Sequence, residues 1–87
     1  MDAGVLARTI GELLETARTV RGVGVRELAR RLGVDHARVK PLEGAGRGRP
    51  ENVELRSVTR QAEALEYRVR IVLEPVEGGA ELSARLG

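Results

Sequence analysis

Apolar residues in the first third of the chain recur at helical spacing and are interrupted by glycine. Between residues 5 and 20 they fall every three or four positions, which predicts an amphipathic helix, with Asp2 as its cap or as a favourable charge at its start. Gly11 lies inside this helix and weakens it by about 1 kcal/mol relative to Ala, which indicates close contact with another element. A second helix is predicted for residues 25–32, and Gly33 supplies a left-handed backbone just past its end.

The middle of the chain continues the helical pattern in two further segments. Asp35 is a suitable N-cap for a third helix, whose inward residues are Val39 and Leu42. A fourth helix is predicted for residues 53–65, with Asn52 or its neighbour as the cap. The expected buried stripe of this helix consists of Leu55, Val58, Ala62 and Leu65.

The pattern changes to a period of two at residues 67–73, which predicts a strand with one buried face. The residues of the apolar face are Tyr67, Val69, Ile71 and Leu73, and they alternate with Arg68, Arg70 and Val72. Pro75 ends the strand. Residues 76–87 are rich in Gly and Ala and only weakly amphipathic, so we expect a partly disordered tail.

Composition narrows the class of protein. A chain of 87 residues has room for one domain, and the stability of so small a monomer is marginal. It contains no Phe, Trp or Cys, so the core must be aliphatic, and disulfides and thiolate metal sites are excluded. No apolar run approaches the roughly 18 residues that span a bilayer, and no signal-peptide hydrophobic region follows the N-terminus. We therefore expect a cytoplasmic protein with no membrane partner.

Basic residues concentrate in the middle of the chain, although the net charge is only +2. Between residues 26 and 49, three acidic residues face seven basic ones, which are Arg26, Arg30, Arg31, Arg38, Lys40, Arg47 and Arg49. This distribution suits a polyanionic partner such as nucleic acid, and a solvated helical face has the same pattern.

The spacing within residues 25–43 is typical of a helix-turn-helix. Such a motif needs a small residue where the two helices cross, a glycine in the turn and apolar residues at fixed inward positions. Ala29 and Gly33 meet the first two requirements. The inward positions are filled by Leu28, Leu32, Val34, Val39 and Leu42.

The stretches Val25-Arg-Glu-Leu-Ala-Arg-Arg-Leu-Gly-Val and Val39-Lys-Pro-Leu-Glu-Gly resemble the Cro/CI-type (XRE) helix-turn-helix family, and the resemblance covers about residues 10–65. It implies a mainly α fold, a compact lambda-repressor-like bundle of four to five helices. Leu14 and Arg18 resemble the first-helix pattern of that family, and the family implies a buried ion pair between Arg18 and Glu43.

Antitoxin-type members of the family add elements after the helical core, sometimes a strand that pairs across a dimer axis. The resemblance thus divides the chain into a helix-turn-helix domain at 1–65, a dimerisation strand at 66–75 and a tail at 76–87. An isolated strand has no hydrogen-bonding partner in its own chain, so a second copy is its simplest source of pairing. The alternative is an extended tail that lies on the helices.

The family's DNA-binding positions carry over onto this sequence. The third helix would enter the major groove, and its base-reading residues would be His36, Ala37, Lys40 and Pro41, with Arg38 nearby. The loop residues Arg47 and Arg49 would contact the DNA backbone.

Four positions depart from the family pattern. Pro41 has no donor for a base, and inside a helix it costs about 3 kcal/mol. Val25 cannot donate to a phosphate through its side chain, Asp35 brings negative charge near the phosphates, and Glu66 stands where Gly or Asn is expected. One hypothesis is that the protein still binds DNA, with the third helix distorted after Lys40. The other is that the scaffold has lost base reading and serves as a dimer or partner-binding module.

Other chemistry has little support in the sequence. His36 is the single histidine and stands without a cluster of metal ligands, and Ser57 and Ser83 have no plausible base. The glycine-rich loop lacks the Lys-Ser/Thr of a phosphate-binding loop. We therefore expect no enzyme, no metal and no cofactor. The leading hypothesis is a homodimeric transcriptional repressor that binds double-stranded DNA. One alternative is an antitoxin-like protein that binds a toxin, and another is a scaffold dimer without DNA activity.

Overall fold

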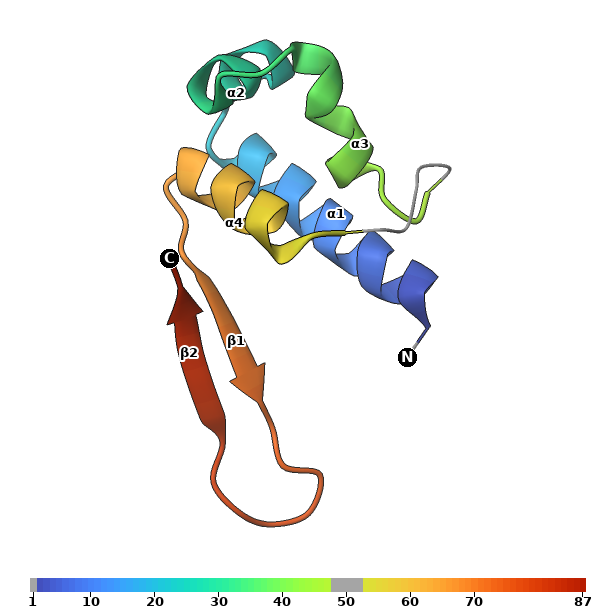
Figure 1. Cartoon of the computed structure of the whole chain (residues 1–87), viewed down its shortest axis with the longest axis vertical. Coiled ribbons are helices and arrows are strands. Elements are labelled where there is room, and N and C mark those ends of the chain that lie inside the picture. Colours follow the sequence, from blue (N-terminus) through green and yellow to red (C-terminus); the bar gives the residue numbers. More distant parts are fainter. Residues whose placement is uncertain (1, 48–52) are drawn as a thin grey trace.

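The computed structural model describes residues 2–47 and 53–87, and in these ranges the protein is mainly helical with a small two-stranded sheet (Figure 1). The mainly α prediction is confirmed. The helices form one body, and the sheet projects from it as a hairpin. In chain order the elements are α1 (Ala3–Val20), α2 (Val25–Leu32), a 3₁₀ turn η1 (His36–Arg38), α3 (Lys40–Glu43), α4 (Leu55–Ala64), β1 (Val69–Leu73) and β2 (Leu82–Leu86).

Helix α1 begins at Ala3, two residues before the predicted start, because Asp2 caps it. The Asp2 carboxylate accepts from the backbone N–H of Val5 at 2.9 Å. The close contact predicted at Gly11 is with α3, since a Cβ there would overlap the carbonyl oxygen of Glu43. The absence of a side chain at this position lets the two helices cross in contact.

The third helix differs from its prediction. Gly33 ends α2 with a φ of 69°, as expected, and the Asp35 carboxylate accepts from the N–H of Ala37 at 2.9 Å. Asp35 nevertheless caps only the turn η1, and the α-helix starts afterwards at Lys40. Pro41 thus falls in the first turn of α3, where a missing N–H has no cost. The expected distortion after Lys40 is wrong, because the interruption comes before that residue.

Helix α4 is shorter than predicted. It begins at Leu55, which is 55% exposed, so the placement of Leu55 in the buried stripe is wrong. Gln61 is buried on this helix and was not expected there. Asn52, one of the two expected caps, lies outside the described residues, and Glu54 occupies the cap position without a side-chain hydrogen bond. The other three predicted stripe residues are buried, namely Val58, Ala62 and Leu65.

Two arginines, one at the C-cap of α1 and one in α2, satisfy the carboxyl end of α4. Arg21 donates to the carbonyls of Leu65 and Glu66 at 3.0 and 3.2 Å, and Arg31 donates to the carbonyl of Ala64 at 2.9 Å. The Arg21 guanidinium also lies 4.3 Å from the centre of the Tyr67 ring. Glu66 has a φ of +66°, the left-handed conformation for which the family pattern has Gly or Asn. These contacts fix the point where the hairpin leaves the helices.

The core is aliphatic, as the composition requires. One cluster joins α2 to the ends of α1 and α4, and its buried residues are Val23, Leu28, Ala29, Val39 and Leu65. A second cluster joins α1, α4 and the base of the hairpin through Leu14, Val58 and Ala62, with Ile10 and Val69 packed against it.

The sheet corrects two predictions. β1 pairs antiparallel with β2, in a register that runs from Val69 opposite Leu86 to Leu73 opposite Leu82. The strand therefore has a partner within its own chain, and residues 82–86 of the expected tail form that partner. The sequence pattern concealed β2 because Leu-Ser-Ala-Arg-Leu is weakly amphipathic and pairs across a long turn.

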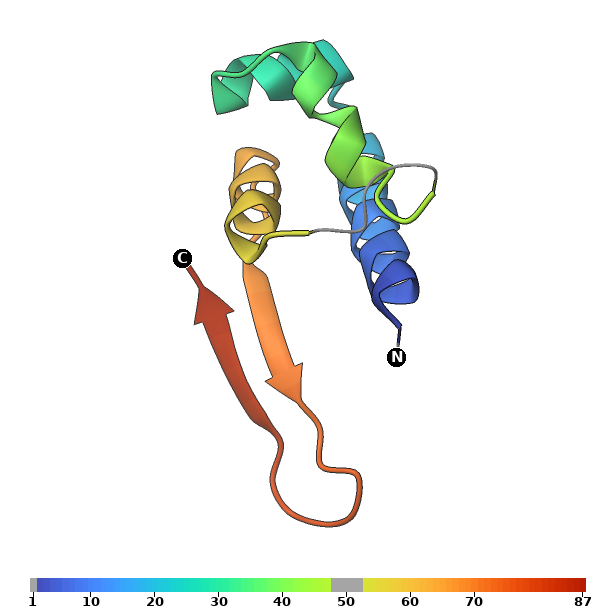
Figure 2. The ribbon, with the colours of Figure 1, turned by 45° about the vertical axis from the view of Figure 1, so that its right-hand side comes forward.

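The expected buried face of the strand is also wrong for the single chain. On this face Val69 is half-buried, Ile71 is 37% exposed and Leu73 is 61% exposed. On the opposite strand Leu82, at the far end, is 63% exposed. Figure 2 shows the reason, since the helices cover only the near end of the hairpin.

Candidate nucleic-acid interface

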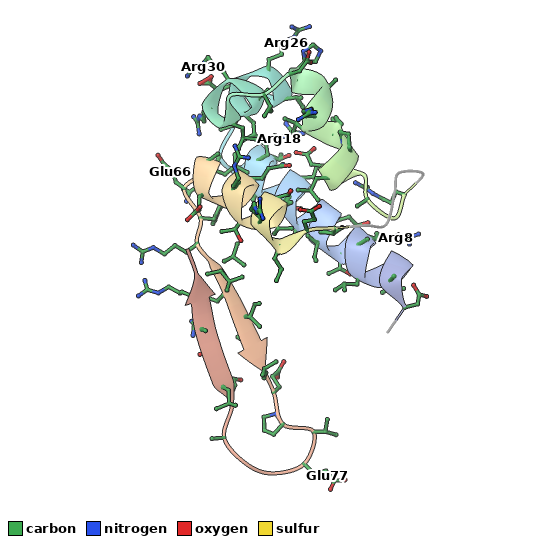
Figure 3. All side chains as sticks on the ribbon, viewed as in Figure 1. Arg8, Arg18, Arg26, Arg30, Glu66 and Glu77 are labelled. Carbon is green, nitrogen blue, oxygen red and sulfur yellow. The ribbon has the colours of Figure 1, made fainter. Side chains whose placement is uncertain are left out.

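The α2–α3 segment, residues 25–43, lies at the end of the molecule opposite the hairpin tip (Figure 1). Leu28, Ala29 and Val39 fasten it to the core, and all three are buried. Figure 3 places Arg26 and Arg30 at this end and Glu77 at the other. The outer surface of the α2–α3 segment is therefore well separated from the hairpin turn.

The turn η1 presents three of the predicted DNA-binding residues together. His36, Ala37 and Arg38 follow one another on this turn, and all are exposed. The Asp35 carboxylate accepts a hydrogen bond from the N–H of Ala37 and lies 3.5 Å from Nδ1 of His36. The side chains of His36, Ala37 and Arg38 are thus exposed on a turn that the Asp35 carboxylate caps.

Lys40 and Arg47 also come together, but around acidic groups. Nζ of Lys40 lies 3.8 Å from a carboxylate oxygen of Glu15 and 3.6 Å from one of Glu43. Nη2 of Arg47 lies 3.7 Å from Glu15 and donates to the carbonyl oxygen of Glu43 at 3.0 Å. The residues that line the hollow between them are Glu15, Lys40, Gly44 and Arg47.

Glu15 was not among the expected site residues, although its spacing from Gly11 indicates that it lies near α3. Glu15 follows Gly11 by one helical turn, so the two residues lie on the same face of α1. Since Gly11 marks where α1 crosses α3, a charged residue one turn later is positioned to reach the side chains of α3.

Pro41 lies at a second hollow, of about 450 Å³, between the α2–α3 segment and α4. Ala37 and Arg38 also line it, so one edge of the hollow is shared with η1. Opposite them are Ser57, Arg60 and Gln61 of α4. Arg49, the remaining predicted DNA-binding residue, lies outside the described residues.

Arg18 and Glu43 form the ion pair that the family resemblance implies. Two hydrogen bonds join them, from Nε to Oε2 at 2.7 Å and from Nη2 to Oε1 at 3.2 Å. Arg18 also donates to the carbonyl of Val23 at 3.0 Å, and Glu43 is completely buried. The hydrogen bond to Glu43 raises the pKa of Arg18 above its ordinary value, helped by the charges of Glu43 and Glu15 against desolvation. The pair ties α3 to α1 beneath the candidate surface.

Part of the positive charge on α2 is already neutralised. Glu27 accepts from Nε of Arg30 at 2.7 Å and lies 3.7 Å from Nε of Arg31. The hydrogen bond from Arg30 lowers the pKa of Glu27, because it favours the ionised carboxylate. Within residues 2–47 and 53–87, no ion pair involves Arg26 or Arg38. Among the described residues, they are the basic side chains of the α2–α3 segment without an acidic partner.

Other site classes are not found in the described part of the chain. It holds no group of three or more His, Cys, Asp or Glu side chains that would suit a metal ion. None of its helices combines the length and apolar character needed to cross a membrane. Comparisons of the chain with protein-family models, curated proteins and solved structures give no match.

Proposed function

We propose that the chain is a DNA-binding transcriptional regulator of the repressor type that acts as a homodimer. The α2–α3 segment serves as its helix-turn-helix, within a lambda-repressor-like helical body. One observation carries this proposal: the side chains of His36 and Arg38 are exposed on η1, and the exposed Arg26, which has no ion pair within the described residues, lies at the same end of the molecule. In helix-turn-helix proteins the early residues of the second helix contact base edges, and neighbouring basic residues contact phosphates.

The shape of the second element limits what each copy reads. η1 has three residues and α3 has four, so no long helix is available to lie along the major groove. His36 and Arg38 are the donors for base edges, and Arg26 is placed for a phosphate. A single copy thus contacts few base pairs, and two copies with their second elements in successive major grooves supply a longer site.

A salt-series titration tests the DNA-binding proposal. A duplex selected by the protein from a random library is titrated with the wild type and with Arg38→Ala, and Arg68→Ala beside β1 is the matched control. A bidentate base contact is worth about 1–3 kcal/mol, so we expect Arg38→Ala to weaken binding roughly 5- to 150-fold and Arg68→Ala to change it little. Absence of binding by the wild type at low salt would remove the proposal.

The exposed apolar face of the hairpin supports the proposal of a homodimer. Its apolar face becomes more exposed with distance from the helices, so the far end lacks cover that a second copy can provide. If β1 of each copy pairs antiparallel about Ile71, then Val69 lies opposite the partner's Leu73, and the apolar faces join. The same register sets Arg70 opposite the partner's Val72 and avoids facing arginines. Each hairpin tip then meets the helical body of the other copy.

Disulfide trapping tests this pairing. The chain has no cysteine, so Ile71→Cys introduces a single thiol. Directly opposed residues of antiparallel strands have Cα atoms about 4.5–5.5 Å apart, which is within disulfide range. We expect rapid oxidation of Ile71→Cys to a covalent dimer. Val76→Cys is the control, since Val76 is 99% exposed in the hairpin turn. Equal rates for the two variants would contradict pairing about Ile71.

A protein-binding role without base reading is the second candidate, and it rests on the polar face of the hairpin. The register sets Arg70 directly opposite Arg85, an unfavourable pair that acidic groups of a partner would stabilise. In this alternative the chain is an antitoxin-like module whose hairpin binds a toxin protein. Its signature is a dimer that binds no duplex at low salt and that captures an acidic protein only while Arg70 and Arg85 are intact.

A further inference from the structure

Glu15 is an acidic residue within the candidate nucleic-acid interface. Its carboxylate lies 3.8 Å from Nζ of Lys40 and 3.7 Å from Nη2 of Arg47, so one α1 side chain faces two of the expected DNA-binding cations. Its side chain is 39% exposed, against 50% for Lys40 and 36% for Arg47. The pairs are therefore within reach of water and of a bound duplex.

Glu43 cannot take the place of Glu15 in this arrangement. Its carboxylate is buried and already accepts two hydrogen bonds from Arg18. Only one oxygen of Glu43 comes near Lys40, at 3.6 Å, and Arg47 contacts the Glu43 backbone instead of its carboxylate. Among the described residues, Glu15 is thus the carboxylate that faces both cations at the surface and has no structural ion pair of its own.

We propose that Glu15 suppresses binding to random DNA by holding Lys40 and Arg47 on the protein. This inference rests on the proposed DNA-binding function and identifies the residue that sets its selectivity. Affinity for random duplex depends almost wholly on cations delivered to phosphates, and each contact adds about 0.9 to the salt slope. Glu15 lowers this electrostatic affinity by pairing with the two cations, and its own negative charge repels phosphate.

Binding to the specific site is affected less. There the base contacts of His36 and Arg38 hold the complex together, and Lys40 and Arg47 remain paired with Glu15. Random DNA offers no base contacts, so binding to it requires both cations to leave Glu15 for phosphates, and only this complex carries the cost of separating them. An acidic residue in this position therefore widens the ratio between specific and random affinity, a form of discrimination that works by repulsion.

The test compares Glu15→Gln with Glu12→Gln. Both residues are on α1 and both changes remove one negative charge, but Glu12 is exposed and has no ion pair within the described residues. Each protein is titrated with a random duplex and with the selected duplex over a salt series. Thermal unfolding of both variants checks that they are folded.

We expect Glu15→Gln to raise affinity for random duplex roughly 2- to 30-fold over Glu12→Gln, because two exposed ion pairs are worth about 0.2–1 kcal/mol each. Its salt slope should steepen by about 1–2, as two cations reach phosphates. The ratio of specific to random affinity should fall. Adding Lys40→Gln and Arg47→Gln to Glu15→Gln should abolish the gain.

Two results overturn the inference while leaving DNA binding intact. One is a Glu15→Gln protein whose affinity and slope match those of Glu12→Gln. The other is a gain that persists after both cations are removed. If the wild type binds neither duplex at low salt, then the proposed function itself fails, and the inference fails with it.

Discussion

Replacing Glu43 with Gln should sharply destabilise the fold, because Glu43→Gln removes a buried charge while keeping the side-chain shape. The change leaves the Arg18 guanidinium, whose side chain is 13% exposed, without its ionic partner. Breaking a buried pair by removing one partner costs about 3–5 kcal/mol. Because Arg18 keeps its bond to the carbonyl of Val23, we expect the lower end, about 3 kcal/mol.

This loss is large relative to the stability of the protein. At about 0.05–0.15 kcal/mol per residue, 87 residues correspond to roughly 4–13 kcal/mol in total. A domain of this size shifts by about 4–8 °C per kcal/mol, so the midpoint of Glu43→Gln should fall by about 12–24 °C. Urea and thermal unfolding followed by far-ultraviolet circular dichroism measure both quantities.

Two controls separate the buried pair from a general charge effect. Glu27→Gln also breaks an arginine pair, but on the surface, so we expect little change in the free energy of unfolding. The double variant Arg18→Met/Glu43→Leu removes both charges and should recover most of the lost stability, since apolar replacements of buried pairs are often neutral. A Glu43→Gln protein within about 1 kcal/mol of the wild type would refute this account of the pair.

Three further predictions concern the backbone, and urea unfolding measures each. Gly11→Ala should destabilise by about 1–3 kcal/mol, because its Cβ would overlap the carbonyl oxygen of Glu43; a gain would contradict the crossing of α1 and α3. Glu66→Gly should stabilise by about 0.5–1 kcal/mol by relieving a φ of +66°, and a loss would show that the residue is not left-handed. Pro41→Ala should change stability by less than about 1 kcal/mol, since Pro41 lies in the first turn of α3; a gain near 3 kcal/mol would mean that it interrupts a helix.

Local backbone chemistry explains why much of the helical body was predictable. The left-handed conformation of Gly33 and the missing side chain of Gly11 are properties of single residues. The cap at Asp2 and the apolar spacing of α2 depend only on nearby residues. These features therefore predict elements and their ends without knowledge of the tertiary fold.

Features that depend on distant contacts were not predictable in the same way. β2 forms because β1 offers it a register, and its own sequence carries little strand signal. Arg21 caps α4 from the end of α1, which depends on how the two helices pack. The break before Lys40 combines both kinds of information: Pro41 is compatible with a helix start or with an interruption, and in the fold it lies in the first turn of α3, after the buried Val39.

The same distinction applies to the candidate site. The sequence brings His36, Ala37 and Arg38 together because they are consecutive on one turn. It gives no direct sign that Lys40 and Arg47 face Glu15, because that contact requires α1 to cross α3. The number of basic residues in a sequence segment therefore does not show which of them are available to a partner. The ion pairs of the folded chain show this more directly.

Amide chemical-shift mapping of the isotope-labelled protein with its selected duplex tests the central claim most directly. The account predicts, at low salt, saturable shifts in η1 and at Arg26, Lys40 and Arg47, and unchanged signals at Val76 in the hairpin turn. Shifts confined to the hairpin, or no shifts at all at low salt, would contradict a DNA-binding role for the α2–α3 segment.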